Sequence, residues 1–221
     1  MRTAISAPLP RSFFEPTARD VAKALLGHWL IRNTPEGPLG GPIVETEAYL
    51  ADDAACHAAR GLTQRNQTMF GPPGHAYVYL IYGYHYCVNA VCQSAGVPEA
   101  VLIRAVEASL GISAMSRNRK VSPETKLTNG PAKLCEAMGI DRRLDGADLC
   151  DRHAELYIAE NPEHRSFRRR NGPVITAVRV GITQAAELPL RFYLEGNRFV
   201  SRAPGQPRSG GGLQASLRSD S

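Results

Sequence analysis

Apolar and polar positions alternate with a period of two along much of the chain. In the segment AYVYLI, Tyr77, Tyr79 and Ile81 fall on one face of an extended strand, and Val78 and Leu80 fall on the other. Runs of this kind, bounded by turn-forming residues, predict strands. The predicted strands are HWLIRN (28–33), PIVETEAYL (42–50), AYVYLI (76–81), HYCVNAVC (85–92), VLIRAVEA (101–108), VITAVRVGI (174–182) and LRFYLEGNRFV (190–200).

Helix signals separate these strands. The sequence TARD forms a capping box for a helix over 17–26, which Gly27 is placed to end. A second helix is predicted over 108–116, and a third over 131–139, with a proline in its first turn. The pattern indicates an α+β class: a single domain built on a largely antiparallel, curved sheet with surrounding helices.

Composition supports a single globular domain and excludes a membrane span. The chain has 221 residues, of which 43% are hydrophobic and 21% charged, without a run of 18 apolar residues. The N-terminal segment lacks an apolar stretch of signal-peptide length, so we expect a cytoplasmic protein. The five cysteines include no CxxC pair, which favours reduced thiols over a metal site. The tail over 202–221 is rich in Gly, Ser and Arg and is predicted to be disordered.

The formal net charge of +5 permits a polyanionic partner. Basic residues concentrate in RNRK (117–120) and HRSFRRRN (164–171), and Arg60, Arg65 and Arg104 flank other motifs. Each run taken alone is typical of a solvated loop. Taken together, the basic residues suggest phosphate contacts, which would give salt-sensitive binding that does not depend on sequence.

Two carboxylates and an aromatic ring share one strand face. Alternation places Glu45, Glu47 and Tyr49 on the same side of IVETEAYL, and His57 follows eight residues after Tyr49. If this face is exposed, the charges need no explanation; if it is buried, they need partners or a purpose. A carboxylate, a histidine, tyrosines and arginines together suit an enzyme that holds a flat aromatic substrate and activates water. The sequence contains no HExxH, GxSxG, GxxxxGK or GxGxxG.

Tyrosine is concentrated in one predicted hairpin. Five of the eight tyrosines lie in YVYLIYGYHYCVN (77–89), with a turn at Tyr82-Gly83. Tyrosine is favoured on half-buried sheet surfaces, so an ordinary aromatic-rich hairpin is one interpretation. A stacking surface for a flat ligand is the other.

Five motifs in this order decide between these interpretations: IVETEAYL, ACHAARG, TQRNQTMFGPPGHAYVYLIYGYHYCVN, VLIRAVE and NGPAKL. Their order and spacing resemble the alkyladenine (3-methyladenine) DNA glycosylase family over about 14–201, which leaves 1–13 as an N-terminal extension. The resemblance implies a single mixed α+β domain, binding in the DNA minor groove through a protruding β-hairpin, and no metal or organic cofactor.

The resemblance also implies catalytic roles. Glu47 matches the general base that deprotonates a water for attack on the anomeric carbon, and Arg104 matches an arginine beside that water. We expect Glu45 to support this pair. Lys133 of NGPAKL raises a Schiff-base alternative, but the family uses water, and lysines at helix N-termini more often meet phosphate.

Binding roles follow from the same resemblance. Tyr49 on one side, with His57 and Tyr79 on the other, would hold a base flipped out of the duplex. Asn89 matches the asparagine that crowds the 2-amino group of guanine. Tyr82 matches the wedge that enters the duplex, and we expect it to contact DNA together with Arg65 and Lys133. The other hairpin tyrosines are assigned to packing.

The expected protein is therefore a monomeric, monofunctional DNA-repair glycosylase. Its expected partner is double-stranded DNA containing alkylated or deaminated purines of the 3-methyladenine, 7-methylguanine, hypoxanthine and ethenoadenine class, from which it leaves an abasic site. Extruding a base costs a few kcal/mol, and stacking on aromatic rings returns about 1–3 kcal/mol per base. The alternatives are a noncatalytic minor-groove protein that bends DNA with Tyr82, and a small-molecule hydrolase.

Overall fold

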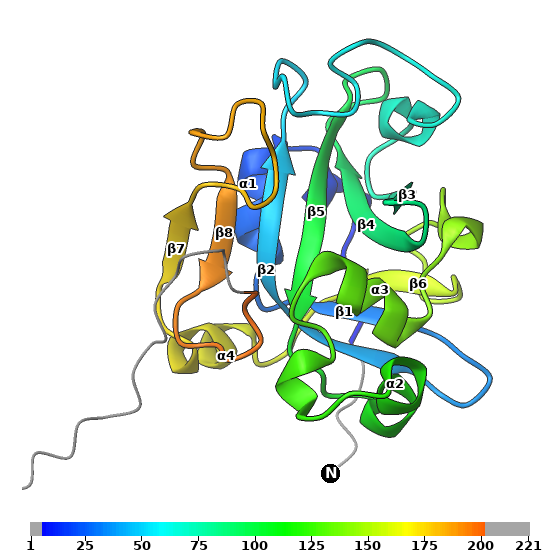
Figure 1. Ribbon diagram of the computed structural model, residues 1–221, viewed down its shortest axis with the longest axis vertical. Coiled ribbons are helices and arrows are strands. Elements are labelled where there is room, and N and C mark those ends of the chain that lie inside the picture. The colour runs from blue at the N-terminus through cyan, green and yellow to red at the C-terminus, as the bar shows by residue number, and fades with distance from the viewer. Residues whose placement is uncertain (1–5, 202–221) are drawn as a thin grey trace, which may run out of the picture.

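An antiparallel sheet is the framework of the molecule (Figure 1). The structure, a computed structural model, describes residues 6–201, and the eight strands in that range belong to this sheet. Six strands follow one another in the order β3–β4–β5–β2–β1–β6, while β8 pairs with β2 and β7 with β8. The predicted α+β class with a largely antiparallel sheet is confirmed. The strands are β1 (Trp29–Arg32), β2 (Leu39–Tyr49), β3 (Ala76–Ile81), β4 (His85–Cys92), β5 (Glu99–Val106), β6 (Leu156–Ala159), β7 (Val174–Ala177) and β8 (Arg191–Leu194).

Strand β2 is the longest and carries the bend of the sheet. Its first residues, Leu39–Pro42, pair with β1, and its second half pairs with β5 on one side and β8 on the other. The register against β5 shifts between Ile43 and Thr46, and such irregularities bend a strand and re-aim its side chains. The strand starts earlier than predicted, because Leu39 and the two glycines after it pair with β1.

One face of the sheet is covered by helix α1 (Ala18–Leu25). The Thr17 side chain accepts the N–H of Asp20, as the capping box predicted, and the helix ends before Gly27. The hydroxyl of Thr46 on β2 donates to the carbonyl of Ala22, which fixes α1 against the strand. Glu47 and Tyr49, which alternate with Thr46 and Ala48, therefore face away from α1.

Helix α3 (Pro131–Met138) confirms the third predicted helix and packs on β4 and β5. The second predicted helix, over 108–116, is partly wrong, since α2 spans Ile112–Arg119. Leu110 forms a bridge with Gly40 of β2, and Gly111 has φ +65°, a left-handed conformation that lies outside a right-handed helix. The helix can begin only after this glycine.

The late strands are shorter than predicted. β7 ends at Ala177, so Arg179 and Val180 lie in a loop rather than in the sheet. β8 ends at Leu194, where the chain turns and the N–H of Gly196 donates to the carbonyl of Asn171.

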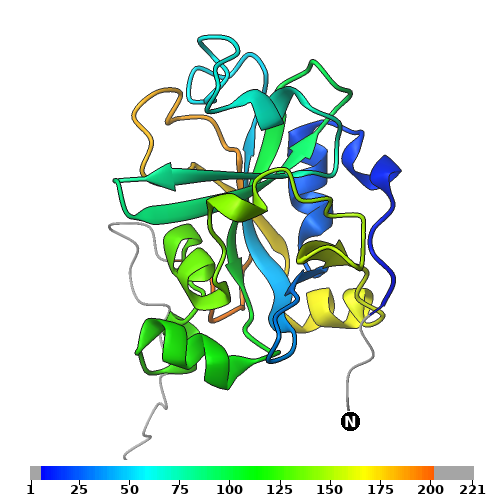
Figure 2. The ribbon, with the colours of Figure 1, turned by 90° about the vertical axis from the view of Figure 1, so that its right-hand side faces the viewer.

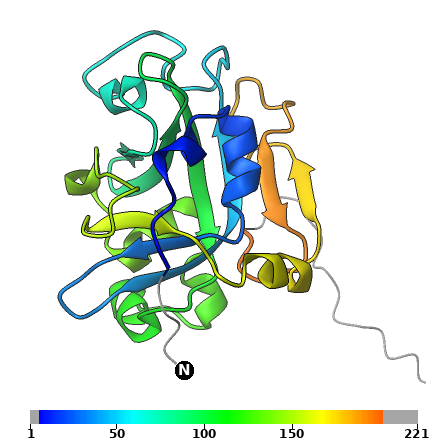
Figure 3. The ribbon, with the colours of Figure 1, turned by 180° about the vertical axis from the view of Figure 1, so that it is seen from behind.

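The basic run HRSFRRRN lies in a helix rather than in a loop, since His164–Arg170 form α4. Phe167 anchors the helix in the core, and the His164 ring lies 2.9 Å from the carbonyl of Leu26 at the end of α1. Seen from behind, α1 and α4 both lie on the near side (Figure 3).

The β3–β4 hairpin protrudes from the other side. Figure 2 shows it reaching outward from the sheet, with α1 and α4 at the opposite side of the molecule. Val78 faces the main core, whereas Tyr77 and Tyr79 face a second, smaller cluster of buried residues, as the alternation predicted. Ile81 pairs with His85, so the turn includes Tyr84 as well as the predicted Tyr82 and Gly83.

The described ends of the chain both join the core. Leu9, in the segment expected to be an N-terminal extension, is buried and donates to the carbonyl of Ile158. Ser201 is also buried. The tail predicted to be disordered, 202–221, lies outside the described residues. Within the described part, helices are too short or too polar to cross a membrane.

Candidate active site

The acidic strand face of β2 is buried, and each carboxylate on it has partners. Glu45 and Glu47 are both fully buried. Arg104, on the neighbouring strand β5, donates through Nε to Glu45 at 2.8 Å and pairs through Nη1 with Glu47 at 2.9 Å. Both carboxylates raise the pKa of Arg104, although burial works against its charge. Arg104 therefore stays charged between two negative groups.

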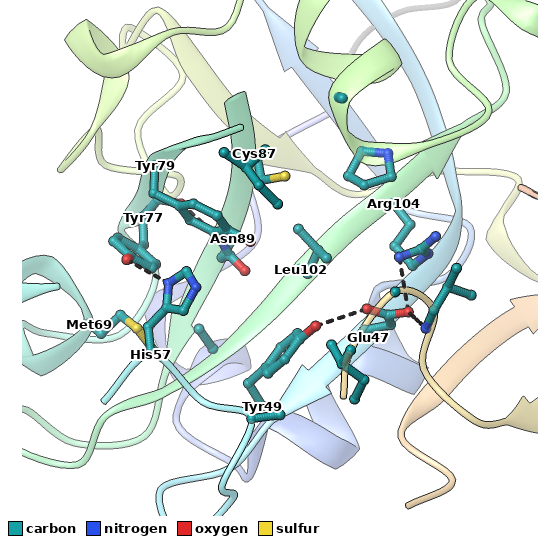
Figure 4. A pocket seen from close by; sticks show the side chains of 18 of the residues that line it. Glu47, Tyr49, His57, Met69, Tyr77, Tyr79, Cys87, Asn89, Leu102 and Arg104 are labelled. Carbon is teal, nitrogen blue, oxygen red and sulfur yellow. Dashed lines mark hydrogen bonds and ion pairs between the residues drawn. The ribbon is translucent and has the colours of Figure 1, made fainter. Parts of the chain in front are cut away.

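Glu47 has two further donors (Figure 4). The backbone N–H of Val180 donates to Oε1 at 2.8 Å, and the Tyr49 hydroxyl donates to Oε2 at 3.1 Å. Burial and the nearby charge of Glu47 raise the pKa of Tyr49 above its ordinary value, so the hydroxyl keeps the proton that it donates. Glu47 is thus held in one orientation by three groups from three separate segments.

Glu45, expected to support Glu47 and Arg104, has more partners than the sequence indicated. Arg191 of β8 donates Nε at 2.7 Å, and Ser201 donates both its backbone N–H at 2.7 Å and its hydroxyl at 2.8 Å. The Ser201 hydroxyl also accepts from Arg104. Two carboxylates and two guanidinium groups balance in charge, which is the arrangement that buried charges require.

An adjoining cavity of about 320 Å³ is lined by aromatic rings. His57, Tyr77 and Tyr79 gather on one side, and Tyr49 lies across from them, next to Glu47 (Figure 4). This volume is at the small end of the usual range for ligand pockets. The cavity therefore suits one flat ring system rather than an extended ligand.

His57 is fixed by the ring cluster. Its Nδ1 lies 3.0 Å from the Tyr77 hydroxyl, and its ring packs edge-on against Tyr79 with centroids 4.4 Å apart. Burial and the neighbouring Arg65 lower the pKa of His57. The imidazole is therefore neutral at pH 7, and a positively charged ring can lie beside it without repulsion. Tyr77, assigned to packing, also lines the cavity.

Asn89 lies at the wall of the same cavity. It is buried, and its Nδ2 donates to the carbonyl of Tyr77 directly across the hairpin at 3.0 Å. The side chain cannot swing aside without losing this bond, so it is a rigid boundary of the space.

Three further residues, Tyr82, Arg65 and Lys133, were expected to contact DNA. Tyr82 is 74% exposed at the hairpin tip and also borders the cavity. Arg65 donates to the carbonyl of Leu80 at 2.9 Å, and its guanidinium lies 5.7 Å from the centre of the Tyr79 ring. Lys133 bonds Asn129 and lines an adjoining groove with Lys126 and Arg198, not the cavity itself.

Sequence reasoning missed a buried ion pair behind Tyr49. Arg179 pairs with Asp53, one of its nitrogens lying 3.0 Å from Oδ1, and donates to the carbonyl of Ala48 at 3.1 Å. The next residue, Val180, supplies the N–H to Glu47. A single arginine within the apolar stretch VITAVRVGI was the available signal, because a charge in such a setting requires a partner.

Comparison with known proteins assigns the chain. The family model described as methylpurine-DNA glycosylase matches residues 12–198. A protein of Methanoculleus marisnigri is 47% identical over 88% of this chain and 98% of its own length, and one of Carboxydothermus hydrogenoformans is 45% identical over the same shares. Both carry the name "Putative 3-methyladenine DNA glycosylase".

The chain is therefore a DNA glycosylase, an enzyme of DNA repair. It belongs to the methylpurine-DNA glycosylase family, which confirms the resemblance seen in the sequence motifs. The noncatalytic DNA-bending protein and the small-molecule hydrolase were wrong alternatives.

Proposed function

We propose that this enzyme excises alkylated or deaminated purines from duplex DNA by hydrolysis. The proposed substrates are of the 3-methyladenine, 7-methylguanine, hypoxanthine and ethenoadenine class, and the product is an abasic site in an intact strand. The names of the relatives support the first of these substrates.

A buried carboxylate at the end of an aromatic cavity carries the proposal. Glu47 accepts hydrogen bonds from the hydroxyl of Tyr49 and the backbone N–H of Val180, and it forms an ion pair with the guanidinium of Arg104. Glu47 therefore acts as a hydrogen-bond acceptor towards its neighbours. A water beside it would also donate to the carboxylate, which can take the proton of that water. Arg104, fixed between Glu45 and Glu47, is a donor that can orient the oxygen of that water.

The proposed step balances without a cofactor. Glu47 takes a proton from water, the water oxygen forms a bond to the anomeric carbon, and the glycosidic bond breaks with its electrons moving to the base. An alkylated purine that carries a positive charge leaves as a neutral molecule. A neutral lesion such as hypoxanthine needs a proton on the leaving base, and that donor is not assigned.

The hairpin accounts for access to a base inside a duplex. Enzymes that act on a base must extrude it from the stack, and the proposed wedge is Tyr82, exposed at the tip of a protruding hairpin. The flipped base would lie between Tyr49 and the rings of His57 and Tyr79. A cationic purine is attracted to the electron-rich faces of such rings.

One assay tests this function. Duplex oligonucleotides that carry ethenoadenine or hypoxanthine are incubated with the enzyme, and abasic sites are detected by alkaline cleavage. We expect cleavage only after alkali, and no covalent trapping by borohydride, because water is the nucleophile. Efficient trapping would move the chemistry to an amine such as Lys133. If neither lesion base is released from the duplexes, the proposal is contradicted.

A further inference from the structure

Helix α4 carries a basic face that the active site does not use. Arg165, Arg168 and Arg169 are related by three and four positions, so they lie on one side of the helix. Arg165 and Arg169 are exposed. Among the described residues, no carboxylate forms an ion pair with any of these three, whereas Arg170 pairs with Glu163 at 3.6 Å.

Helix α4 lies far from the pocket, on the side of the sheet that α1 covers (Figure 2). His164 contacts the end of α1, and α1 covers the face of β2 opposite Glu47. Figure 2 shows the β3–β4 hairpin at one side of the molecule and α4 at the other. A straight duplex held at the hairpin therefore does not reach α4.

We propose that α4 binds a second segment of duplex DNA while the pocket face holds the first. A helix of seven residues is about 10 Å long, and a duplex presents about six phosphate charges over that length. Guanidinium groups match phosphate oxygens with paired hydrogen bonds. The proposal rests on the proposed function only in assigning the first duplex to the pocket face.

The surface chemistry of α4 favours nucleic acid over an acidic protein. Protein interfaces have an apolar or aromatic centre. The large apolar side chains exposed in the described chain are Leu62, Leu80, Tyr82, Tyr84 and Val178. None of these belongs to α4, whose apolar residue Phe167 is buried. This face therefore fits a partner that carries uniform negative charge and is recognised by charge alone, such as the phosphate backbone of DNA.

The test uses two short duplexes with different fluorophores. The first contains an abasic analogue and occupies the pocket face, and the second is undamaged and is titrated at several salt concentrations. We expect energy transfer between them on the wild-type enzyme. Because each phosphate contact contributes about −0.9 to the slope of log K against log salt, R165Q/R169Q should lower the magnitude of the slope for the second duplex by about 2.

The controls separate this inference from the proposed function. R152Q removes one exposed charge elsewhere on the surface and should leave binding of the second duplex unaffected. Excision from a short lesion duplex should be unchanged in R165Q/R169Q. An unchanged salt slope, a parallel loss of excision, or binding of polyglutamate in place of DNA would each overturn the inference. A wild type without glycosylase activity would contradict the proposed function alone, since the slopes remain measurable.

Discussion

The guanidinium carbon of Arg179 lies 4.7 Å from the centre of the Tyr49 ring. The same guanidinium pairs with Asp53, and its side chain has no exposure to solvent. Since Tyr49 is one wall of the cavity and Val180 donates to Glu47, one buried arginine fixes both the wall and a donor to the proposed base.

Replacing Arg179 should lower the free energy of unfolding. Arg179→Met leaves Asp53 buried without its partner, and breaking a buried ion pair in this way costs about 3–5 kcal/mol. Urea unfolding measures the loss. R179M/D53N also removes the unpaired charge of Asp53, so it should recover a large part of the free energy of unfolding that Arg179→Met loses. Equal instability of the single and double variants would show that the charge of Asp53 is not the cause.

Glu47→Gln should separate binding from chemistry. The amide keeps the shape of the side chain and cannot accept the proton, so single-turnover excision of ethenoadenine should slow at least about a hundredfold. Affinity for a duplex with an abasic analogue should stay near that of wild type.

The matched control is Glu45→Gln, which is close in sequence and does not line the cavity. Four donor bonds reach Glu45, so an amide there should lower stability. Because Glu45 does not line the cavity, we expect this variant to keep most of its activity. If Glu47→Gln excises the base at the wild-type rate, Glu47 is not the general base.

Tyr82 combines exposure with an unusual backbone conformation. Its φ is +53°, in the left-handed region that disfavours residues with a side chain. Tyr82→Ala should weaken binding to lesion duplex by about 1–3 kcal/mol, the value of a stacking contact, and should spare the fold. Tyr82→Gly should lose the same affinity and gain thermal stability relative to Tyr82→Ala, because glycine tolerates this φ. Filter binding and melting curves measure the two effects. Unchanged affinity in both variants would exclude a wedge.

Local pattern was sufficient for the central strands and the faces of their side chains. Alternation placed Glu47 and Tyr49 on one side of β2, and the structure has both at the cavity. It could not locate Ser201, whose bonds to Glu45 span 156 positions of sequence. It also read Arg179 as part of a strand, because the apolar residues around it alternate in the same way whether or not the arginine finds a distant carboxylate.

Asn89 should set the boundary against guanine. Its Nδ2 is held by the carbonyl of Tyr77, so the side chain cannot yield to a bulkier base edge. Asn89→Ser shortens the side chain, and slow release of guanine or of damaged guanines rejected by wild type is expected. Chromatography of the released bases measures this. Lower stability as the sole change would indicate a structural asparagine.

His28 should make the fold sensitive to acid. It stacks on His164 with ring centroids 4.3 Å apart, and burial, followed by the charges of His164 and Arg168, lowers the pKa of His28 to about 4. Between that value and the ordinary 6.5, the unfolded chain binds a proton that the folded chain does not. The contribution of His28 to stability is therefore full above pH 6.5 and is lost as the pH drops toward 4, by on the order of 3 kcal/mol. His28→Phe keeps the ring and removes the titration, so its free energy of unfolding should fall less between pH 7 and 5. The exposed His153, changed to Gln, serves as the control and should follow wild type. If His28→Phe loses as much stability as wild type over this interval, other groups cause the acid sensitivity.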